Sequence, residues 1–466
     1  MSVFSRNIAR RHRVLFSALA VTAVFAGCAA GPSRDELAVG QPGTAEETLN
    51  ELFNLTGLYQ RIGRIAAGPP ISFVGQLAFL AGRGDSTLTL MGISLDNRTL
   101  AFQRSGRDFI ARYRVEMAFH RPDQLPVFYA RNEVVSVATF QETQRAEESV
   151  LFQQGFLLEP DVYRVTVTVR DPGSASFSQT EATVQVPHLR VGTTTAPILV
   201  YQATPRKNLW VEPQILLNPR GMVAHGDDSL SVYVEGYGFE GPRDVPFRTT
   251  DEFGKESHSL ALSFSGGAAV EGHLFHLPAE TPALGRLVLQ VGGGSDSTKR
   301  LTALVSFSRS WALTNYDNLF SLLRYFGQDD RLDALRRAAP EERPALWRVF
   351  WKETDPNPNT ADNEALDRYF TRIAIANQRF RDEGGATGGW RTDRGEVYVT
   401  LGEPDLIQET PPGNDQRYVL WEYSNYGTQL LFEGNIGFSR LRLTPASRAE
   451  FARVRVLAQQ RQNSPN

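Results

Sequence analysis

The chain has 466 residues, of which 41% are hydrophobic and 22% charged, so it can build several globular cores and allows about three domains. The formal net charge of −3 provides no overall basic field, which excludes the usual signature of nucleic-acid binding. Cys28 is the single cysteine, so no disulfide can form within the chain and its domains must hold by packing.

Residues 1–27 resemble a secretory signal peptide. A basic stretch, RNIARRHR at 6–13, precedes an apolar run at 14–27 that is too short to span a bilayer core of about 30 Å. The sequence FAG before Cys28 resembles the bacterial lipobox, which predicts lipidation of this cysteine. A buried cysteine in an ordinary signal peptide is the alternative. The resemblance implies an outer-membrane lipoprotein that faces the periplasm, with exposure on the cell surface left open.

Residues 28–45 are rich in Gly, Pro, Ala and charge, which predicts a flexible tether. The segment 46–70 follows it. A capping box at 44–47 and apolar residues at helical spacing predict an amphipathic helix over about 45–66.

From residue 71 the hydrophobic period changes to two, which predicts strands. Residues 109–119 and 158–170 alternate between apolar and polar side chains, a pattern typical of half-buried antiparallel strands. The sequence LEPDVY at 158–163 resembles the lead-in to the penultimate strand of bacterial immunoglobulin-like sandwiches. We therefore expect an immunoglobulin-like β-sandwich over 71–190.

A second set of alternating segments follows a polar stretch at 191–197, which is interpreted as a linker. These segments lie near 229–235, 258–264, 286–291 and 301–307. Their strand-turn-strand layout resembles that of the first set and predicts a second immunoglobulin-like sandwich over 197–308.

Beyond this point helical spacing returns. Helices are predicted over 315–352 and 362–383, and a last helix over 445–460. Strands are predicted at about 396–401, 418–423, 428–433 and 438–443. The chain is thus expected to be multidomain and mainly β: two immunoglobulin-like β-sandwiches followed by a C-terminal α+β domain over 311–460, with helices before a small antiparallel sheet.

The sequence GWRTDRGEVYVTLGEPD at 389–405 belongs to a longer pattern. With FWKETDPNPNTADN at 350–363, VLWEYSNYG at 419–427 and LLFEGNIGFSRLRL at 430–443, it is similar in content and order to the GWxTD domain of bacterial envelope lipoproteins. The molecular role of that family is unassigned. The order Leu-Gly-x-Pro, Trp-x-Tyr and a final strand also resembles the small lipoprotein of the outer-membrane barrel-assembly machinery, which implies a module that binds a partner.

Ten residues are the candidates for a structural or binding role of the motif region. They are Gly389, Trp390, Thr392, Asp393, Arg394, Gly395, Gly402, Pro404, Trp421 and Tyr423. Glycine lets the chain turn, tryptophan can anchor the loop, and short Thr and Asp oxygens can accept backbone N–H bonds. The guanidinium of Arg394 suits a carboxylate. A folding corner, a binding site and a catalytic site all remain open.

Catalysis would need carboxylates that converge. Asp393, Glu403 and Asp405 form the alternative site, that of a periplasmic hydrolase of glycan or peptide, if they lie about 5–10 Å apart in one cleft. No histidine or cysteine lies in this domain. His273 and His276 are three apart in a predicted strand, on opposite faces, so no metal or other cofactor is expected. The favoured function is non-enzymatic binding of another envelope protein.

Overall fold

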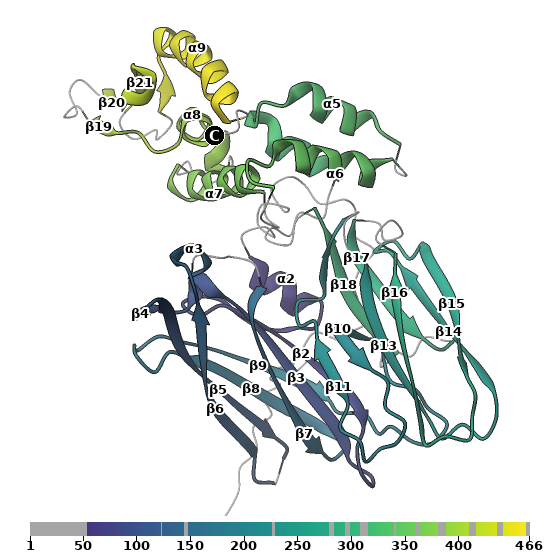
Figure 1. Ribbon diagram of the computed structural model, residues 1–466. Helices are drawn as coiled ribbons and strands as arrows, with labels where there is room; N and C mark the ends of the chain where they lie inside the picture. The colour runs from purple at the N-terminus through teal and green to yellow at the C-terminus, as the bar shows by residue number, and fades with distance from the viewer. Residues whose placement is uncertain are drawn as a thin grey trace, which may run out of the picture. The chain divides into compact units, whose positions relative to one another are not determined.

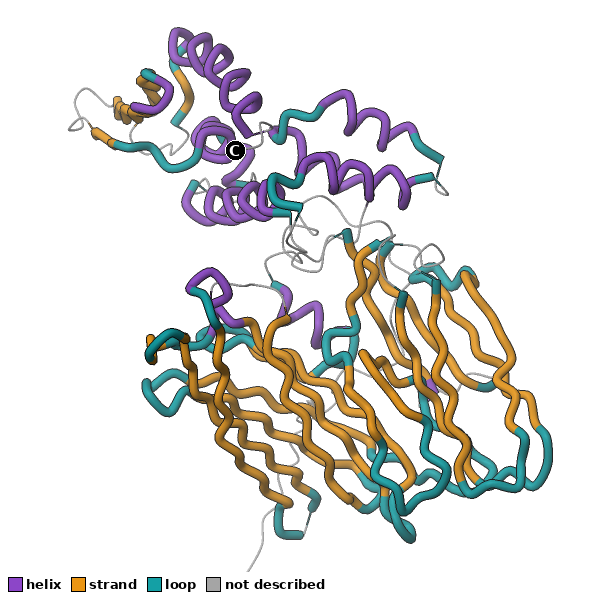
Figure 2. The backbone as a smooth tube through the Cα atoms, in the orientation of Figure 1, coloured by secondary structure: helices purple, strands orange, loops and turns teal. Residues whose placement is uncertain are grey.

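The computed structural model describes residues 54–122, 124–143, 148–225, 229–278, 284–293, 299–307, 316–339, 342–358, 363–380, 388–409, 416–435 and 441–462. Within these residues strands dominate up to residue 306 and helices dominate beyond it, as the orange and purple segments of Figure 2 show. The predicted class, mainly β with a C-terminal α+β part, is confirmed. The signal-like segment, Cys28 and the tether lie outside the described residues.

The first described helix is shorter than predicted. Helix α2 spans Leu55–Arg61 and is followed by strand β1, Ile65–Ala67. The helix ends because Gly63 turns the chain at a φ of 81°, a conformation that favours glycine. Ile65 then pairs with a neighbouring strand. The predicted helix over 45–66 is therefore wrong at its C-terminal end, and its first residues, 45–53, lie outside the described residues.

The first sandwich consists of β1 and eight further strands (Figure 1). These are β2 (Phe73–Ala81), β3 (Thr87–Asp96), β4 (Gln103–Ser105), β5 (Asp108–His120), β6 (Val127–Val137), β7 (Glu148–Leu158), β8 (Val162–Arg170) and β9 (Phe177–Gln185). Two short helices, η1 (Asn97–Thr99) and α3 (Phe140–Thr143), interrupt them. The strands predicted over 109–119 and 158–170 are confirmed as β5 and β8.

Among the described residues, all strand pairs of this sandwich are antiparallel. One sheet has the order β1-β2-β3-β7, and in the other β5 pairs with β6 on one edge and with β4 and β8 on the opposite edge, while β9 follows β8. Side chains from both sheets, such as Ile93, Val115 and Val167, share one buried core. The hydroxyl of Tyr163 donates to the carbonyl of Glu159 at 3.0 Å, the tyrosine corner of immunoglobulin-like domains.

The described residues of the second sandwich form nine strands. They are β10 (Ile198–Thr204), β11 (Gln214–Leu217), β12 (Met222–Ala224), β13 (Leu230–Tyr237), β14 (Arg243–Thr250), β15 (Glu256–Phe264), β16 (Val270–Leu277), β17 (Gly285–Val291) and β18 (Arg300–Ser306). The sheets β11-β10-β13-β16 and β12-β18-β17-β14-β15 enclose a second core that includes Val232, Phe247 and Leu289. Only β12 and β18, among the described strands, form a parallel pair.

The two sandwiches pack on each other through their facing sheets. A separate apolar cluster joins Leu80 of β2 and Leu90 of β3 to Val200, Leu217 and Tyr233 of the second sandwich. Strands β3 and β13 are consequently buried along almost their whole length, on both faces. The polar stretch at 191–197 is not a free linker, since the amide of Thr195 donates to the Glu235 carbonyl at 2.8 Å and the amide of Tyr237 donates to the Thr193 carbonyl at 2.9 Å.

An ion pair is buried at this interface. The guanidinium of Arg206 donates to the carboxylate of Glu235 at 2.9 Å and to the Ala81 carbonyl at 2.8 Å. The hydroxyls of Tyr233 and Tyr237 donate to the same carboxylate at 2.8 and 2.7 Å. Burial lowers the pKa of Arg206, but the hydrogen bond and charge of Glu235 raise it above its ordinary value. The carboxylate of Glu235 therefore balances the buried positive charge of Arg206.

The C-terminal unit combines helices with a four-stranded antiparallel sheet. Its helices are α4 (Tyr316–Leu322), η3 (Leu323–Tyr325), α5 (Asp329–Arg337), α6 (Arg343–Thr354), α7 (Glu364–Arg379), η4 (Gly389–Arg391), α8 (Asp393–Leu401), η5 (Ser424–Tyr426) and α9 (Pro445–Gln462). Its strands, in sheet order, are β19 (Leu406–Glu409), β20 (Gln416–Tyr423), β21 (Thr428–Asn435) and β22 (Arg442–Leu443).

One apolar core unites this unit. It runs from Phe307 and Leu319 through α7 to Val454 and Ala458 of α9. Helix α7 begins at Asn363, whose side chain accepts the Leu366 amide at 3.0 Å. The predicted helices, the strands at 418–423 and 428–433, and the last helix are confirmed. The strand predicted at 438–443 is described only as β22, and the strand predicted at 396–401 is wrong.

Candidate functional site

The segment 388–405 forms a corner of two short helices, η4 and α8, where a strand was predicted. Thr392 caps α8, its side chain accepting the Gly395 amide at 3.1 Å, and Gly402 ends the helix at a φ of 92°. All residues from Val397 to Leu401 are buried, so the alternation of Val and Tyr separates no inner face from an outer one. Caps and burial therefore override the strand preference of these β-branched residues.

Trp390 anchors the corner. Its side chain is 0% exposed, and its ring lies edge-on to that of Tyr325, with centroids 5.9 Å apart. The guanidinium of Arg391 lies 4.9 Å from its ring centroid. The amide of the preceding Gly389 donates to the side-chain oxygen of Asn377 at 2.9 Å, which fixes the loop to α7. The sequence did not predict this role of Asn377.

Within the corner, Gly395 and Thr392 both contact the backbone of the residues just before them. A Cβ atom at Gly395 would overlap the carbonyl oxygen of Gly389 and lie 2.7 Å from the backbone of Trp390, so only glycine fits. The hydroxyl of Thr392 donates to the same Gly389 carbonyl at 2.7 Å. The motif residues thus contact one another, as a structural corner requires.

Asp393 ties the corner to the end of the chain. Its carboxylate accepts the Leu443 amide of β22 at 2.8 Å and forms an ion pair with Arg448 of α9. One turn along α8, Glu396 lies 3.5 Å from Arg455. Burial raises the pKa of Glu396, and the charges of Arg455 and Arg448 oppose that shift. Asp393 was expected to accept a backbone N–H bond within its own turn, and the bond that it accepts comes instead from Leu443, 50 residues further along the chain.

The arginines that pair with these carboxylates were not predicted. The guanidinium of Arg394 lies over the ring of Phe380, 5.3 Å from the centroid, and its pairing with a carboxylate stays a prediction. Arg448 and Arg455 are seven residues apart, two turns of α9, and therefore share a face of that helix. This spacing of seven residues is the feature of the sequence that could have identified the two arginines as a pair on one helix face.

The remaining candidates stabilise the far end of α8. The carbonyl of Gly402 accepts the hydroxyl of Tyr423 at 3.0 Å, and burial raises the pKa of that tyrosine. Pro404 is buried beside them. Trp421, 2% exposed, lies between the rings of Phe380 and Phe432 at centroid distances of 5.4 and 4.8 Å.

The three carboxylates of the hydrolase alternative have separate partners. Glu403 binds Arg379 at 2.6 Å, and this hydrogen bond lowers the pKa of the carboxyl. Asp405 accepts the Ser424 amide at 2.6 Å. Asp393 begins α8 and Glu403 follows its end, so a helix about 12 Å long, at 1.5 Å per residue, lies between their backbones. This spacing argues against a shared catalytic cleft, which requires about 5–10 Å.

His273 and His276 both lie in β16, three residues apart and so on opposite faces of the strand. Nδ1 of His276 lies 3.0 Å from the hydroxyl of Ser231. In the described ranges, no group of three or more His, Cys, Asp or Glu side chains is arranged to hold a metal ion. No described helix has the length and hydropathy needed to cross a bilayer.

Comparison with protein families gives one match, to the GWxTD domain, over residues 289–441. Comparison with curated protein sequences finds no match. Among solved structures, the calcium binding domain CBD12 of CALX1.1 is similar at 10% identity, covering 56% of this chain and 87% of that chain with a TM-score of 0.13. The FN1–FN3 domains of chicken CNTN1 are similar at 10% identity, covering 47% and 75%, with a TM-score of 0.12. Scores this low carry no argument about fold or function.

Proposed function

Because the chain carries a GWxTD domain at residues 289–441, we propose that it acts as a binding module of the bacterial envelope and catalyses no reaction. The observation that carries the proposal is that the side chains of the motif are engaged in contacts within the domain. Trp390 and Gly395 pack inward, while Asp393 and Glu403 are each held by an arginine at opposite ends of α8. Groups committed in this way build a surface but are poorly placed to transfer a proton together.

The proposal includes a lipid anchor at Cys28. The anchor is supported by the basic and apolar segments that precede this residue and by the FAG sequence before it. Each buried methylene of an acyl chain contributes about 0.8 kcal/mol, and two or more chains hold a protein stably at a membrane. The protein would then face the periplasm from the outer membrane, with another envelope protein as its partner.

The anchor is tested by fractionation of cells that express Cys28→Ser. The variant has no thiol to acylate, so the protein should move from the outer-membrane fraction to the soluble periplasmic fraction. Ala30→Ser, two residues further on, makes a similar change without removing the thiol and should leave the distribution unchanged. Retention of the Cys28→Ser variant in the membrane would reject the anchor.

The binding role is tested by photo-crosslinking in cells. A photoreactive residue at Arg391 or Asn425, both exposed and adjacent to Trp390 and Tyr426, should trap one specific protein. The same residue at Glu181, exposed on β9 of the first sandwich, serves as the control position. If the C-terminal positions capture nothing that the control does not, the binding module loses its support.

A further inference from the structure

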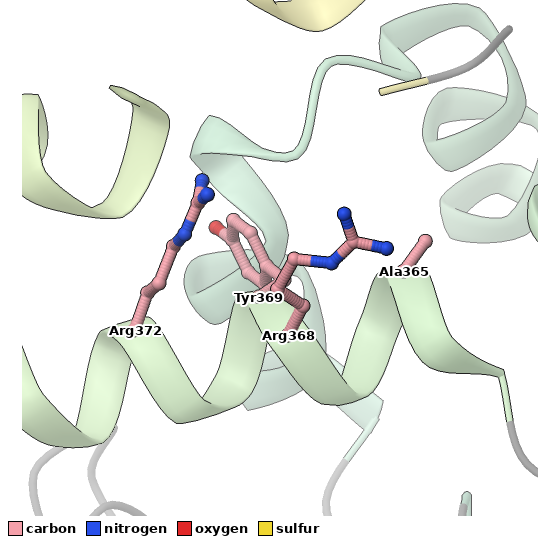
Figure 3. Close-up of a pocket in the computed structure, with 4 residues that line it drawn as sticks. All are labelled: Ala365, Arg368, Tyr369 and Arg372. Carbon is pink, nitrogen blue, oxygen red and sulfur yellow. The ribbon is translucent and has the colours of Figure 1, made fainter. Parts of the chain in front are cut away.

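Helix α7 carries two arginines on one side. Arg368 and Arg372 are four residues apart, so they lie on the same face one turn from each other. With Ala365 and Tyr369 they line a pocket of about 280 Å³, part of which is open to solvent. Figure 3 shows both guanidinium groups on the same side of the helix, with the small side chain of Ala365 beside Arg368 and the Tyr369 ring between the two.

Arg372 is fixed in place. Its Nη1 donates to the carbonyls of Val399 and Thr400, at 3.3 and 3.2 Å, and so caps the C-terminal end of α8. A Cβ atom at Gly402 would lie 2.9 Å from its Nη2, so the glycine that ends α8 leaves room for the guanidinium. Burial lowers the pKa of Arg372, and the neighbouring charge of Arg368 lowers it further.

Among the residues that the structure describes, no carboxylate pairs with the positive charge of these two arginines. Neither Arg368 nor Arg372 forms an ion pair within the described ranges, whereas Arg379, further along α7, binds Glu403 at 2.6 Å. Like charges one turn apart repel each other. The Tyr369 hydroxyl donates to the Leu322 carbonyl at 2.6 Å and accepts the Tyr325 amide at 3.2 Å, so it contributes a wall to the pocket and no negative charge.

We propose that the pocket between Arg368 and Arg372 binds a phosphate group. Two guanidinium groups carry two positive charges, and a phosphate monoester carries about −1.5 to −2 at pH 7. Each guanidinium presents a planar fork that fits phosphate oxygens. The four lining residues all come from one helix, so the pocket is a hollow in the surface that receives the phosphate while the rest of the ligand stays outside. The inference is independent of the anchor and of a protein partner.

The test is calorimetric titration of the full chain, purified in detergent, with inorganic phosphate and separately with short-chain phosphatidic acid. Arg368→Gln is the informative variant, because Arg368 is exposed and holds no other element, while Arg372 caps α8. Loss of charge-assisted hydrogen bonds should weaken binding about tenfold or more. Arg379→Gln, on the same helix but already paired, is the matched control and should bind like the parent.

Binding of inorganic phosphate that Arg368→Gln weakens and Arg379→Gln does not would support the site and a free phosphate ligand. Binding of phosphatidic acid alone, with the same dependence on Arg368, would support a lipid headgroup as the source of the phosphate. Absence of binding in both titrations would overturn the proposal. Equal weakening by the two variants, or acetate binding as tightly as phosphate, would overturn it as well.

Discussion

The interface between the two sandwiches and the corner at 388–405 both bury polar groups, but they draw on the sequence differently. At the interface, Arg206 meets a carboxylate 29 residues away and a carbonyl 125 residues away. At the corner, Gly389, Thr392 and Gly395 are each three residues apart and contact one another. A contiguous motif is thus visible because its contacts are local, whereas an equally buried long-range network leaves no motif.

The largest expected effect breaks the long-range network. Glu235→Ala leaves the guanidinium of Arg206 buried without a counter-charge and removes the acceptor of the Tyr233 and Tyr237 hydroxyls. Breaking a buried ion pair costs about 3–5 kcal/mol. The free energy of unfolding, measured by urea denaturation with circular dichroism of the strands, should fall by that amount.

The paired change provides the control for this prediction. Arg206→Met combined with Glu235→Leu removes both charges and should recover part of the lost stability, because no buried charge is then left unpaired. A Glu235→Ala variant as stable as the parent would show that the interface is hydrated or open in solution. The interface would then not be a buried long-range network that can be contrasted with the local contacts of the corner.

The features that could be predicted from the sequence are those that depend on local contacts, and the features that were missed depend on long-range contacts. Alternation located most strands, and helical spacing located α7 with its buried stripe of Leu366, Tyr369 and Ile373, because these patterns depend on near neighbours. The packing of the sandwiches on each other was not predicted, since burial of β3 and β13 on both faces depends on a partner sheet distant in the chain.

The corner was predicted in part. Glycines for turning, Trp390 for anchoring and Thr392 as an acceptor follow from side-chain chemistry, and the structure has each in that role. The strand assigned to 396–401 failed because Val and Tyr favour strands in general, while the two caps and full burial make this segment a helix. Arg448 and Arg455 of α9 lie 55 and 59 residues from the carboxylates that they pair with, beyond any local pattern.

A smaller loss of stability is expected when the local contacts of the corner are changed. Gly395→Ala gains about 1 kcal/mol of helix propensity, but the new methyl group overlaps the Gly389 carbonyl and the Trp390 backbone. The overlap is with backbone atoms that cannot rotate away, so we expect a cost at the upper end of the range for overpacking, about 2–3 kcal/mol, and a net loss of about 1–2 kcal/mol. Five of the six tryptophans lie after residue 308, so the urea transition followed by tryptophan fluorescence reports on this unit.

Gly241→Ala is the matched control for this variant. Gly241 lies between β13 and β14 of the second sandwich, so the unfolding of this variant is followed by circular dichroism of the strands. A Cβ atom there meets no atom within 4 Å, so the free energy of unfolding should change by no more than about 0.5 kcal/mol. If Gly395→Ala were as stable as Gly241→Ala, the close approach of α8 to the loop before it would not exist in solution. The motif would then need a reason other than the fit of its own backbone, and a ligand-binding role for these residues would become the stronger explanation.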